Sequence, residues 1–308
     1  EESYVPIHYI FTSIISTEFM IGILGNGFII LVNFIDWVKI RKIFLVDQIL
    51  TALAISRICL ILVCLSTVYH PFLLMKEIEV RIIIFSWIFA NHFSLWFATI
   101  LAIFYLLKIA SFSRSIFLYL KWRVKKVILM LLLGNLIILI LNLIQINIYI
   151  EDWICGNERN TTWNSRMSDF ATFSDLVTFN MTMFSIPPFT VALIAFLLLI
   201  FSLWQHLQNM QHNFKGPRDP RTSAHITALK IMISFLLLYA IYFLSLFILW
   251  LLKMQNKLVH ILILNFGFIY PSSHSFILIW GNSKLRKPFI LVLKQLRCGL
   301  KDEKLTIL

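Results

Sequence analysis

The chain has 308 residues, of which 59% are hydrophobic and only 14% are charged, whereas a typical soluble domain is about 45–50% apolar and about 25% charged. This composition excludes a disordered, collagen-like or disulfide-stapled chain and argues strongly against a soluble enzyme, whose surface needs more charge. The net charge of +12 could suggest nucleic acid binding, but the class that remains is a polytopic membrane protein.

Seven apolar stretches are long enough to cross a bilayer, whose hydrocarbon core of about 30 Å requires about 20 mostly apolar residues in a helix. They lie at residues 7–34, 46–71, 82–110, 127–150, 176–205, 226–252 and 260–281. Each is too long and too continuously apolar for a strand of a membrane barrel. We therefore predict an all-α membrane protein, with seven transmembrane helices in a single domain over residues 1–308 and a short basic tail at 282–308.

Basic residues are distributed unevenly between the two sets of connecting loops. Most of the 27 Lys and Arg residues follow the first, third and fifth stretches or lie in the tail. The positive-inside rule places these segments in the cytoplasm, so the N-terminus is predicted outside and the C-terminus inside. Attraction to anionic membrane lipid explains the basic loops without nucleic acid. A cytoplasmic protein partner on the same face is a second interpretation, and both can hold.

A glycosylation sequon agrees with this orientation. Asn160 begins an Asn-Thr-Thr sequence that matches the acceptor pattern, and it lies in the segment 151–175, which we predict to be an outer loop. Asn160 is therefore our predicted glycosylation site. A second sequon begins at Asn180, inside a predicted span, and we expect it to be unused.

Four different short motifs occur in order along the predicted helices. They read QILTALAISR at 48–57, FYLLKIA at 104–110, SFLLLY at 234–239 and YPSSHSFILI at 270–279. With these motifs the chain resembles the bitter taste receptor family, taste receptor type 2, over nearly its whole length. Rhodopsin-like receptors differ, because they carry Asp-Arg-Tyr in the third helix, Asn-Pro-x-x-Tyr in the seventh and an acid in the second, where this chain has Arg57.

The resemblance implies a multi-pass G-protein-coupled receptor of the plasma membrane that performs no chemistry and needs no cofactor or metal. Such a receptor binds small bitter compounds between the outer halves of its helices and activates a gustducin-like heterotrimeric G protein. A type 1 vomeronasal-like receptor is the alternative within chemosensory receptors. A transporter or channel is the alternative from another class, although it would usually need paired polar residues, broken helices or repeat symmetry in the membrane.

Candidate ligand-binding residues lie in the outer halves of the helices. Trp87 and Asn91 are four residues apart and share one helix face; they offer a flat apolar wall and a donor–acceptor pair, although core packing would suit them too. The resemblance assigns the matching residues to the ligand pocket, and Tyr242 to an aromatic position that couples ligand to helix movement. Further candidates from the resemblance are Ser66, Thr67, Phe184 and Leu264. The seventh stretch contains no Asp or Glu, so we expect neutral, apolar ligands.

Two charged residues inside predicted spans require polar surroundings, because an unpaired charge in the bilayer is costly. We expect Arg57 to turn inward and join a structural or switching network, with a hydrated position near a helix end as the alternative. The other members of this network are Asn26, Ser272, His274 and Ser275. Glu18, in the outer half, could meet a ligand or hydrogen-bond to a neighbouring helix.

The predicted cytoplasmic side carries polar residues around the expected G-protein cleft. They are Tyr105, Lys108, Ser202, His206, His225, Lys230 and Lys284. Ordinary anchoring at the membrane interface is the alternative interpretation of the same residues.

Overall fold

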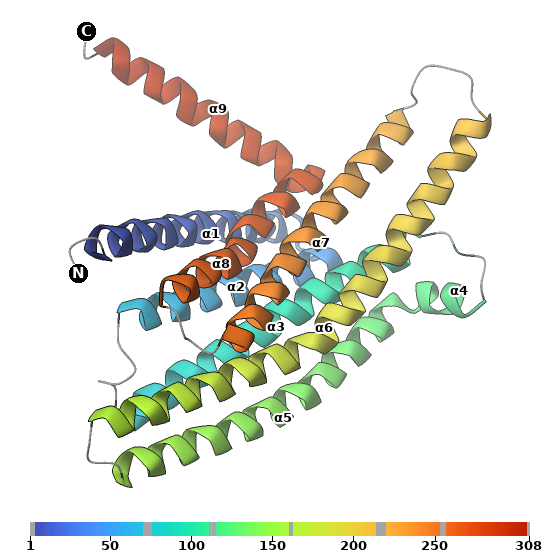
Figure 1. Ribbon diagram of the computed structural model, residues 1–308. Coiled ribbons are helices and arrows are strands. Elements are labelled where there is room, and N and C mark those ends of the chain that lie inside the picture. The colour runs from blue at the N-terminus through green and yellow to red at the C-terminus, as the bar shows by residue number, and fades with distance from the viewer. Residues whose placement is uncertain are drawn as a thin grey trace.

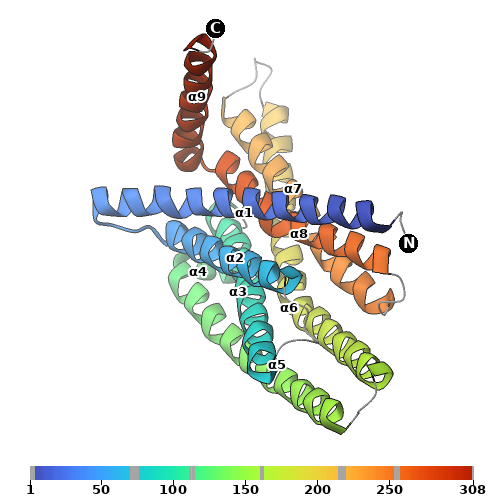
Figure 2. The ribbon, with the colours of Figure 1, turned by 90° about the vertical axis from the view of Figure 1, so that its left-hand side faces the viewer.

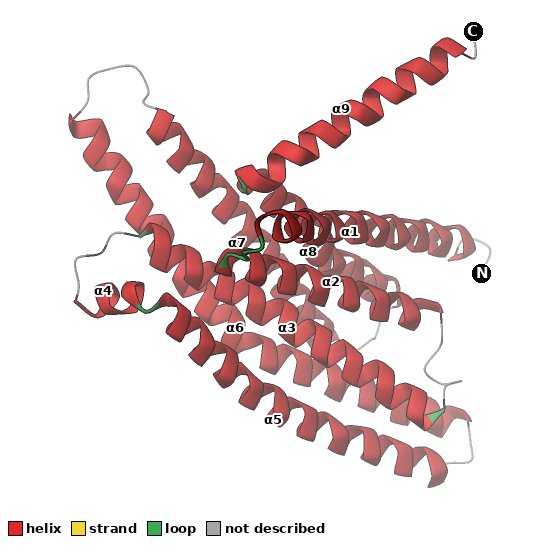
Figure 3. Ribbon diagram, turned by 180° about the vertical axis from the view of Figure 1, so that it is seen from behind, coloured by secondary structure: helices red, strands yellow, loops and turns green. Residues whose placement is uncertain are grey.

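The computed structural model describes residues 4–69, 76–110, 112, 115–159, 163–213, 220–252 and 257–306. The helices, in chain order, are α1 (Tyr4–Ile40), α2 (Leu45–Tyr69), α3 (Glu77–Ile109), α4 (Ser115–Trp122), α5 (Val124–Arg159), α6 (Trp163–Asn213), α7 (Pro220–Leu252), α8 (Lys257–Gly281) and α9 (Ser283–Thr306). No strand occurs in these described segments (Figure 3), so the prediction of an all-α protein is confirmed.

Six helices of the described part are long and apolar enough to cross a membrane. They are Ser13–Ile40, Leu45–Ser66, Glu77–Ile109, Val124–Gly156, Ser168–Gln205 and Lys230–Leu251. The stretch 260–281, which we predict as the remaining span, falls within α8. Large apolar side chains cover the outside of the bundle, among them Met130 at 72% exposure and Ile137 at 63%, as expected of a surface that faces lipid tails.

The transmembrane helices form a closed ring. Each of α1, α2, α3, α5, α6, α7 and α8 packs against the next, and α8 packs back against α1 (Figures 1 and 2). Because α3 also contacts α6, it lies at the centre of the ring. The main apolar core forms around it and includes Leu101, Phe196 and Phe235. We name the two ends of the bundle after the termini of α3, the Glu77 end and the Ile109 end.

The segment 151–175, which we predict as a loop, is largely helical. Helix α5 continues to Arg159 and α6 begins at Trp163. No Gly or Pro interrupts the sequence from residue 163 to 175, and aromatic packing holds the two helix ends together. The rings of Trp153 and Phe173 stack with centroids 4.8 Å apart. The loop prediction is therefore wrong for most of this segment.

The tail after Gly281 is also helical, although we predict it as a short basic segment. Asn282 caps α9 by accepting a hydrogen bond from the Lys284 backbone N–H at 3.0 Å. Phe289 then anchors the helix, with its ring centroid 5.3 Å from that of Phe28 in α1 and 6.2 Å from that of Phe276 in α8. Beyond this anchor α9 points away from the bundle, with the C-terminus at its far end (Figure 1).

Helices α1 and α8 approach each other closely at two glycines. A Cβ atom on Gly22 would lie 2.9 Å from Ser272 Oγ, and one on Gly25 would overlap Ser275 Oγ. Small residues at such spacing let membrane helices pack backbone to backbone. Asn26 follows Gly25 directly, and its Nδ2 atom donates a hydrogen bond of 3.3 Å to the carbonyl of Pro271. This contact fixes the register of α1 against α8.

Candidate functional site

Asn91 of α3 is the point at which three helices meet. The Tyr242 hydroxyl of α7 donates a hydrogen bond to Asn91 Oδ1, and Asn91 Nδ2 lies 3.9 Å from Met181 Sδ of α6. Asn91 and Tyr242 are buried, with 4% and 7% of their surfaces exposed. The pair therefore ties α3 to α7 inside the part of the bundle nearer the Glu77 end.

A small cavity lies beside Asn91, between α3, α5 and α6. Its volume is about 10 Å³, which is the space of about one water molecule. It is lined by Ile88, Asn91, His92, Leu95, Trp96, Asn142, Met181, Phe184, Ser185 and Pro188. A compound larger than water would have to displace some of these side chains, so the cavity is closed to such compounds in this structure.

Trp87 lies one turn before Asn91 but does not line this cavity. Its half-buried ring packs between two apolar clusters, one formed mainly by α3, α5 and α6 and the other by α1 and α2. The Ser66 hydroxyl donates within its own helix to the Val63 carbonyl at 2.7 Å. The side chains of Thr67 and Leu264 lie outside the described residues.

Arg57 is fully buried between α2 and α8, with an exposed fraction of 0%. Its guanidinium carbon lies 4.9 Å from the ring centroid of Tyr270. The His274 ring stacks on Tyr270 with centroids 5.6 Å apart and lies tilted against Phe235 with centroids 4.0 Å apart. The remaining members of the predicted network, Asn26, Ser272 and Ser275, are buried at the same α1–α8 contact. Glu18 is half-buried, and its Oε2 atom has no hydrogen-bond partner among the described residues.

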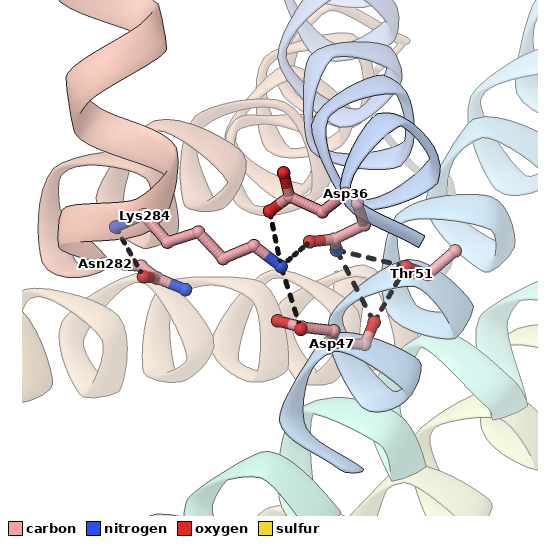
Figure 4. Close-up of polar contacts among 6 residues, drawn as sticks. Asp36, Asp47, Thr51, Asn282 and Lys284 are labelled. Carbon is pink, nitrogen blue, oxygen red and sulfur yellow. Dashed lines mark hydrogen bonds and ion pairs between the residues drawn. The ribbon is translucent and has the colours of Figure 1, made fainter. Parts of the chain in front are cut away.

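At the Ile109 end, Lys284 of α9 joins two acidic side chains (Figure 4). Its Nζ atom lies 3.0 Å from Asp36 Oδ2 of α1 and 2.8 Å from Asp47 Oδ2 of α2, and it donates to Asn33 Oδ1 at 3.3 Å. Thr51 Oγ1 donates to the Asp47 carbonyl at 2.7 Å and accepts from Asn33 Nδ2 at 3.1 Å. A cleft of about 240 Å³ opens beside these residues. We call Lys284, Asp36, Asp47 and Asn33 the Lys284 cluster.

Lys284 keeps its positive charge at neutral pH. Partial burial by itself would lower the pKa of Lys284, but hydrogen bonds to Asp47 and Asp36 and their negative charges outweigh burial, and the pKa is raised. A cation whose pKa is raised by folding stabilises the folded state at neutral pH and loses that contribution only as the pH rises through its folded value. The contribution of the Lys284 charge should therefore be lost in alkaline solution.

Comparison with known proteins identifies the family. The family model described as taste receptor protein (TAS2R) matches residues 5–297. The chain belongs to the taste receptor type 2 family. Taste receptor type 2 member 13 of Pongo pygmaeus is 60% identical over 296 residues, covering 94% of this chain and 97% of that protein. The protein of the same name in Homo sapiens is 59% identical over 296 residues, with the same two coverages, and that of Mus musculus is 54% identical over 301 residues, covering 96% and 98%.

Membership in the taste receptor type 2 family confirms the resemblance seen in the sequence motifs. The chain is thus a bitter taste receptor, a multi-pass membrane protein and not an enzyme. In the described part of the receptor, no group of three His, Cys, Asp or Glu side chains could hold a metal ion.

The structure of this taste receptor brings together some of the predicted ligand-site residues and adds others. Asn91 and Phe184 both line the small cavity, and Tyr242 contacts Asn91. Sequence reasoning missed His92, whose Nε2 lies 3.0 Å from the Asn135 carbonyl of α5, and Asn142. One signal was available in α5. Asn135 and Asn142 are seven residues apart and therefore share a helix face, and amides in an apolar span point inward.

The residues predicted at the G-protein cleft of the receptor have different environments. Lys108 and Lys230 are exposed, Tyr105 is half-buried in the main core, and Ser202 is buried. Lys284 forms ion pairs with Asp36 and Asp47. The side chains of His206 and His225 lie outside the described residues, as does the whole of Asn160.

Proposed function

We propose that this receptor binds small, neutral, largely apolar bitter compounds at the Glu77 end of the bundle, between α2, α3, α6, α7 and α8. The observation that carries the proposal is the bond between Tyr242 and Asn91, because it joins α7 to α3 next to a closed cavity. Pockets for small ligands are mostly apolar with a few polar groups that fix orientation. The apolar side chains around Asn91 and the absence of Asp and Glu from residues 260–281 support this ligand class.

The receptor is oriented, in this proposal, with the Glu77 end outside the cell and the Ile109 end in the cytoplasm of a plasma-membrane protein. The basic residues support it, since most of them lie in the segments on the Ile109 side. The same residues attract anionic lipid headgroups. Asn160, between α5 and α6, would then be glycosylated on the outside.

Activation would proceed through α7. A ligand shifts a conformational equilibrium only by its differential affinity for the two states. A compound that enters beside Asn91 competes with the Tyr242 hydroxyl for the amide and thereby releases α7 from α3. Helices α6 and α7 extend beyond α3 at the Ile109 end (Figure 1), so a tilt of α7 opens a cleft there. Nucleotide exchange on a gustducin-type heterotrimeric G protein follows, with Tyr105, Lys108, Ser202 and Lys230 at the cleft.

The pocket is tested by Trp87→Ala in cells that carry a gustducin-type chimeric G protein, because Trp87, although outside the closed cavity, lies one turn from Asn91 and packs against α2, a helix that borders the proposed pocket. Removal of a large apolar wall costs a ligand that uses it about 1.4 kcal/mol or more, which corresponds to about a tenfold loss of affinity. We expect the agonist concentration for half-maximal calcium release to rise at least about tenfold. The matched control is Phe89→Ala, because Phe89 lies on the same helix but is 53% exposed on its outside. Equal responses of Trp87→Ala and Phe89→Ala at equal surface expression would exclude Trp87 from the pocket.

The role of the tie between α3 and α7 is tested by Tyr242→Phe, which removes only the hydroxyl. One hydrogen bond contributes about 1 kcal/mol net, so its loss should raise the small active population about fivefold. We expect nucleotide exchange on the G protein without agonist to increase by that factor in purified receptor. Tyr119→Phe serves as the control, since Tyr119 is 57% exposed. An unchanged basal rate in Tyr242→Phe would show that the bond does not hold α7 in its resting position.

A further inference from the structure

Arg57 is a buried cation without a counter-charge in the part of the receptor that the structure describes. The ion pairs in that part involve Arg81 and Lys284, not Arg57. None of the Nε, Nη1 and Nη2 atoms of Arg57 makes a hydrogen bond of good geometry among the described residues, although the Tyr270 hydroxyl lies close enough to interact with the guanidinium. A charge buried away from water is ordinarily paired, because leaving it unpaired costs far more than one hydrogen bond contributes. The guanidinium therefore calls for an anionic partner.

The geometry around Arg57 leaves its N–H groups available. Its flat face lies over Tyr270, with the guanidinium carbon 4.9 Å from the ring centroid. A guanidinium has five N–H donors. The contact with Tyr270 and its hydroxyl holds the cation in place and leaves most of these donors available.

The neighbours of Arg57 add further donors. Tyr239 stacks on Tyr270 with ring centroids 5.3 Å apart. The hydroxyls of Tyr239 and Tyr270 are buried, make no hydrogen bond of good geometry among the described residues, and lie close enough to Arg57 to interact with its charge. Hydroxyl groups donate as well as accept, so α7 and α8 can add donors to those of Arg57 on α2. A single negative charge would satisfy them and neutralise Arg57.

Helix α1 carries two acids, Glu18 and Asp36, and Asp36 already pairs with Lys284. Glu18 is therefore the acid of α1 to consider as a counter-charge for Arg57, but its position is unfavourable. Helix α1 meets α8 at the level of Pro271 through Asn26, one residue from the Tyr270 ring over which Arg57 lies. Glu18 precedes Asn26 by eight residues, which is about 12 Å along a helix at 1.5 Å per residue. Its carboxylate makes no ion pair with Arg57 among the described residues.

We propose that Arg57 binds a small monovalent anion of the halide class, chloride in a cell, at the junction of α2, α7 and α8. One negative charge balances one guanidinium, and a spherical ion accepts from donors on several helices without a fixed geometry. The tightly packed surroundings, in which Arg57, Tyr239 and Tyr270 are among the largest fully buried side chains, exclude larger organic anions. The bound anion links α2 to α7 and α8 and stabilises the folded bundle.

The proposal is tested by thermal unfolding of the purified receptor in lipid nanodiscs. Sodium chloride, sodium bromide and sodium gluconate are compared at about 150 mM and equal ionic strength. For a site that is about 90% filled, linkage predicts a midpoint about 3–5 °C higher in chloride or bromide than in gluconate. Arg57→Gln should abolish this difference. Lys108→Gln should retain it, because Lys108 is an exposed cation at the Ile109 end.

Three results would overturn the proposal in this assay. Identical midpoints of the wild-type receptor in chloride and gluconate would show that no such ion stabilises the bundle. A chloride effect that persists in Arg57→Gln would place the ion elsewhere. Chloride dependence that appears only in Glu18→Gln would identify Glu18 as the counter-charge and equally exclude the anion.

A second measurement on the wild-type receptor avoids dependence on a variant that fails to fold. Bromide replaces chloride in crystals of the receptor, and its anomalous scattering locates it. We expect a peak within about 3.5 Å of the Arg57 nitrogen atoms, the hydrogen-bond range for a halide. Bromide peaks confined to the surface would contradict the proposal.

Discussion

Gly25→Ala is expected to destabilise the receptor, whereas Gly27→Ala, two residues away, should leave it unchanged or more stable. A Cβ on Gly25 would overlap Ser275 Oγ and lie 3.1 Å from Phe276 Cε2, while a Cβ on Gly27 meets nothing within 4 Å. Overpacking of this kind costs about 1–3 kcal/mol, against the gain of up to about 1 kcal/mol for replacing Gly by Ala in a helix. The two substitutions are chemically identical, so the difference between them isolates the α1–α8 contact.

The effect on the receptor should be larger than the added methyl suggests. If α1 moves away from α8, the bond from Asn26 to Pro271 lengthens beyond its 3.3 Å and the register of the two helices is lost. We expect a lower thermal midpoint and reduced surface expression for Gly25→Ala, measured in nanodiscs and by surface labelling. Equal midpoints for Gly25→Ala and Gly27→Ala would mean that α1 and α8 are not packed as closely as in this structure.

The fold could be predicted from the sequence because bilayer physics limits the choices. An apolar run of about 20 residues in lipid must be helical to satisfy its backbone, and each predicted stretch overlaps a helix. The helix ends could not be predicted in the same way. Polar residues that leave the membrane still continue a helix when no Gly or Pro stops it, as at the start of α6. The position of α9 depends on contacts of its residue Phe289 with α1 and α8, and no local sequence pattern contains these contacts.

The candidate site is less accessible from the sequence because its contacts are long-range. Tyr242 and Asn91 are 151 positions apart; the family resemblance suggested each of them separately as a candidate but not their hydrogen bond to each other. Lys284 was predicted only as a residue of the G-protein cleft, and its ion pairs with Asp36 and Asp47 were missed, although one signal was present. Asp36 and Asp47 are acids at the end of the bundle that the basic residues dominate, and an acid buried there, as Asp47 is at 5% exposure, requires a cation.

Lys284→Gln is expected to lower the stability of the receptor by about 2 kcal/mol. Loss of one partner of a fully buried ion pair costs about 3–5 kcal/mol because the other charge is left unpaired. The value is smaller here because the side chain of Lys284 is 30% exposed and that of Asp36 is 31% exposed, while Asp47 at 7% is buried. A drop in thermal midpoint of about 4–8 °C follows. Lys287→Gln, which removes an exposed cation one turn away on the same helix, should have little effect.

A double-mutant cycle separates the ion pair from other effects of the substitution. Removing Asp47 as well, in Lys284→Gln/Asp47→Asn, takes away the unpaired buried charge, so the double variant should be more stable than the sum of the single losses predicts. Strict additivity would mean that Lys284 and Asp47 do not interact.

Signalling of Lys284→Gln distinguishes the Lys284 cluster from the predicted G-protein contact. If Lys284 only fastens α9 to α1 and α2, calcium release per surface receptor should equal that of the wild type even though fewer receptors reach the surface. If its ammonium contacts the G protein directly, release per receptor should fall severalfold at an unchanged agonist affinity. We expect the first result, because the Nζ atom already lies within 3.3 Å of three acceptors on α1 and α2 and the G protein would have to break these bonds to use it.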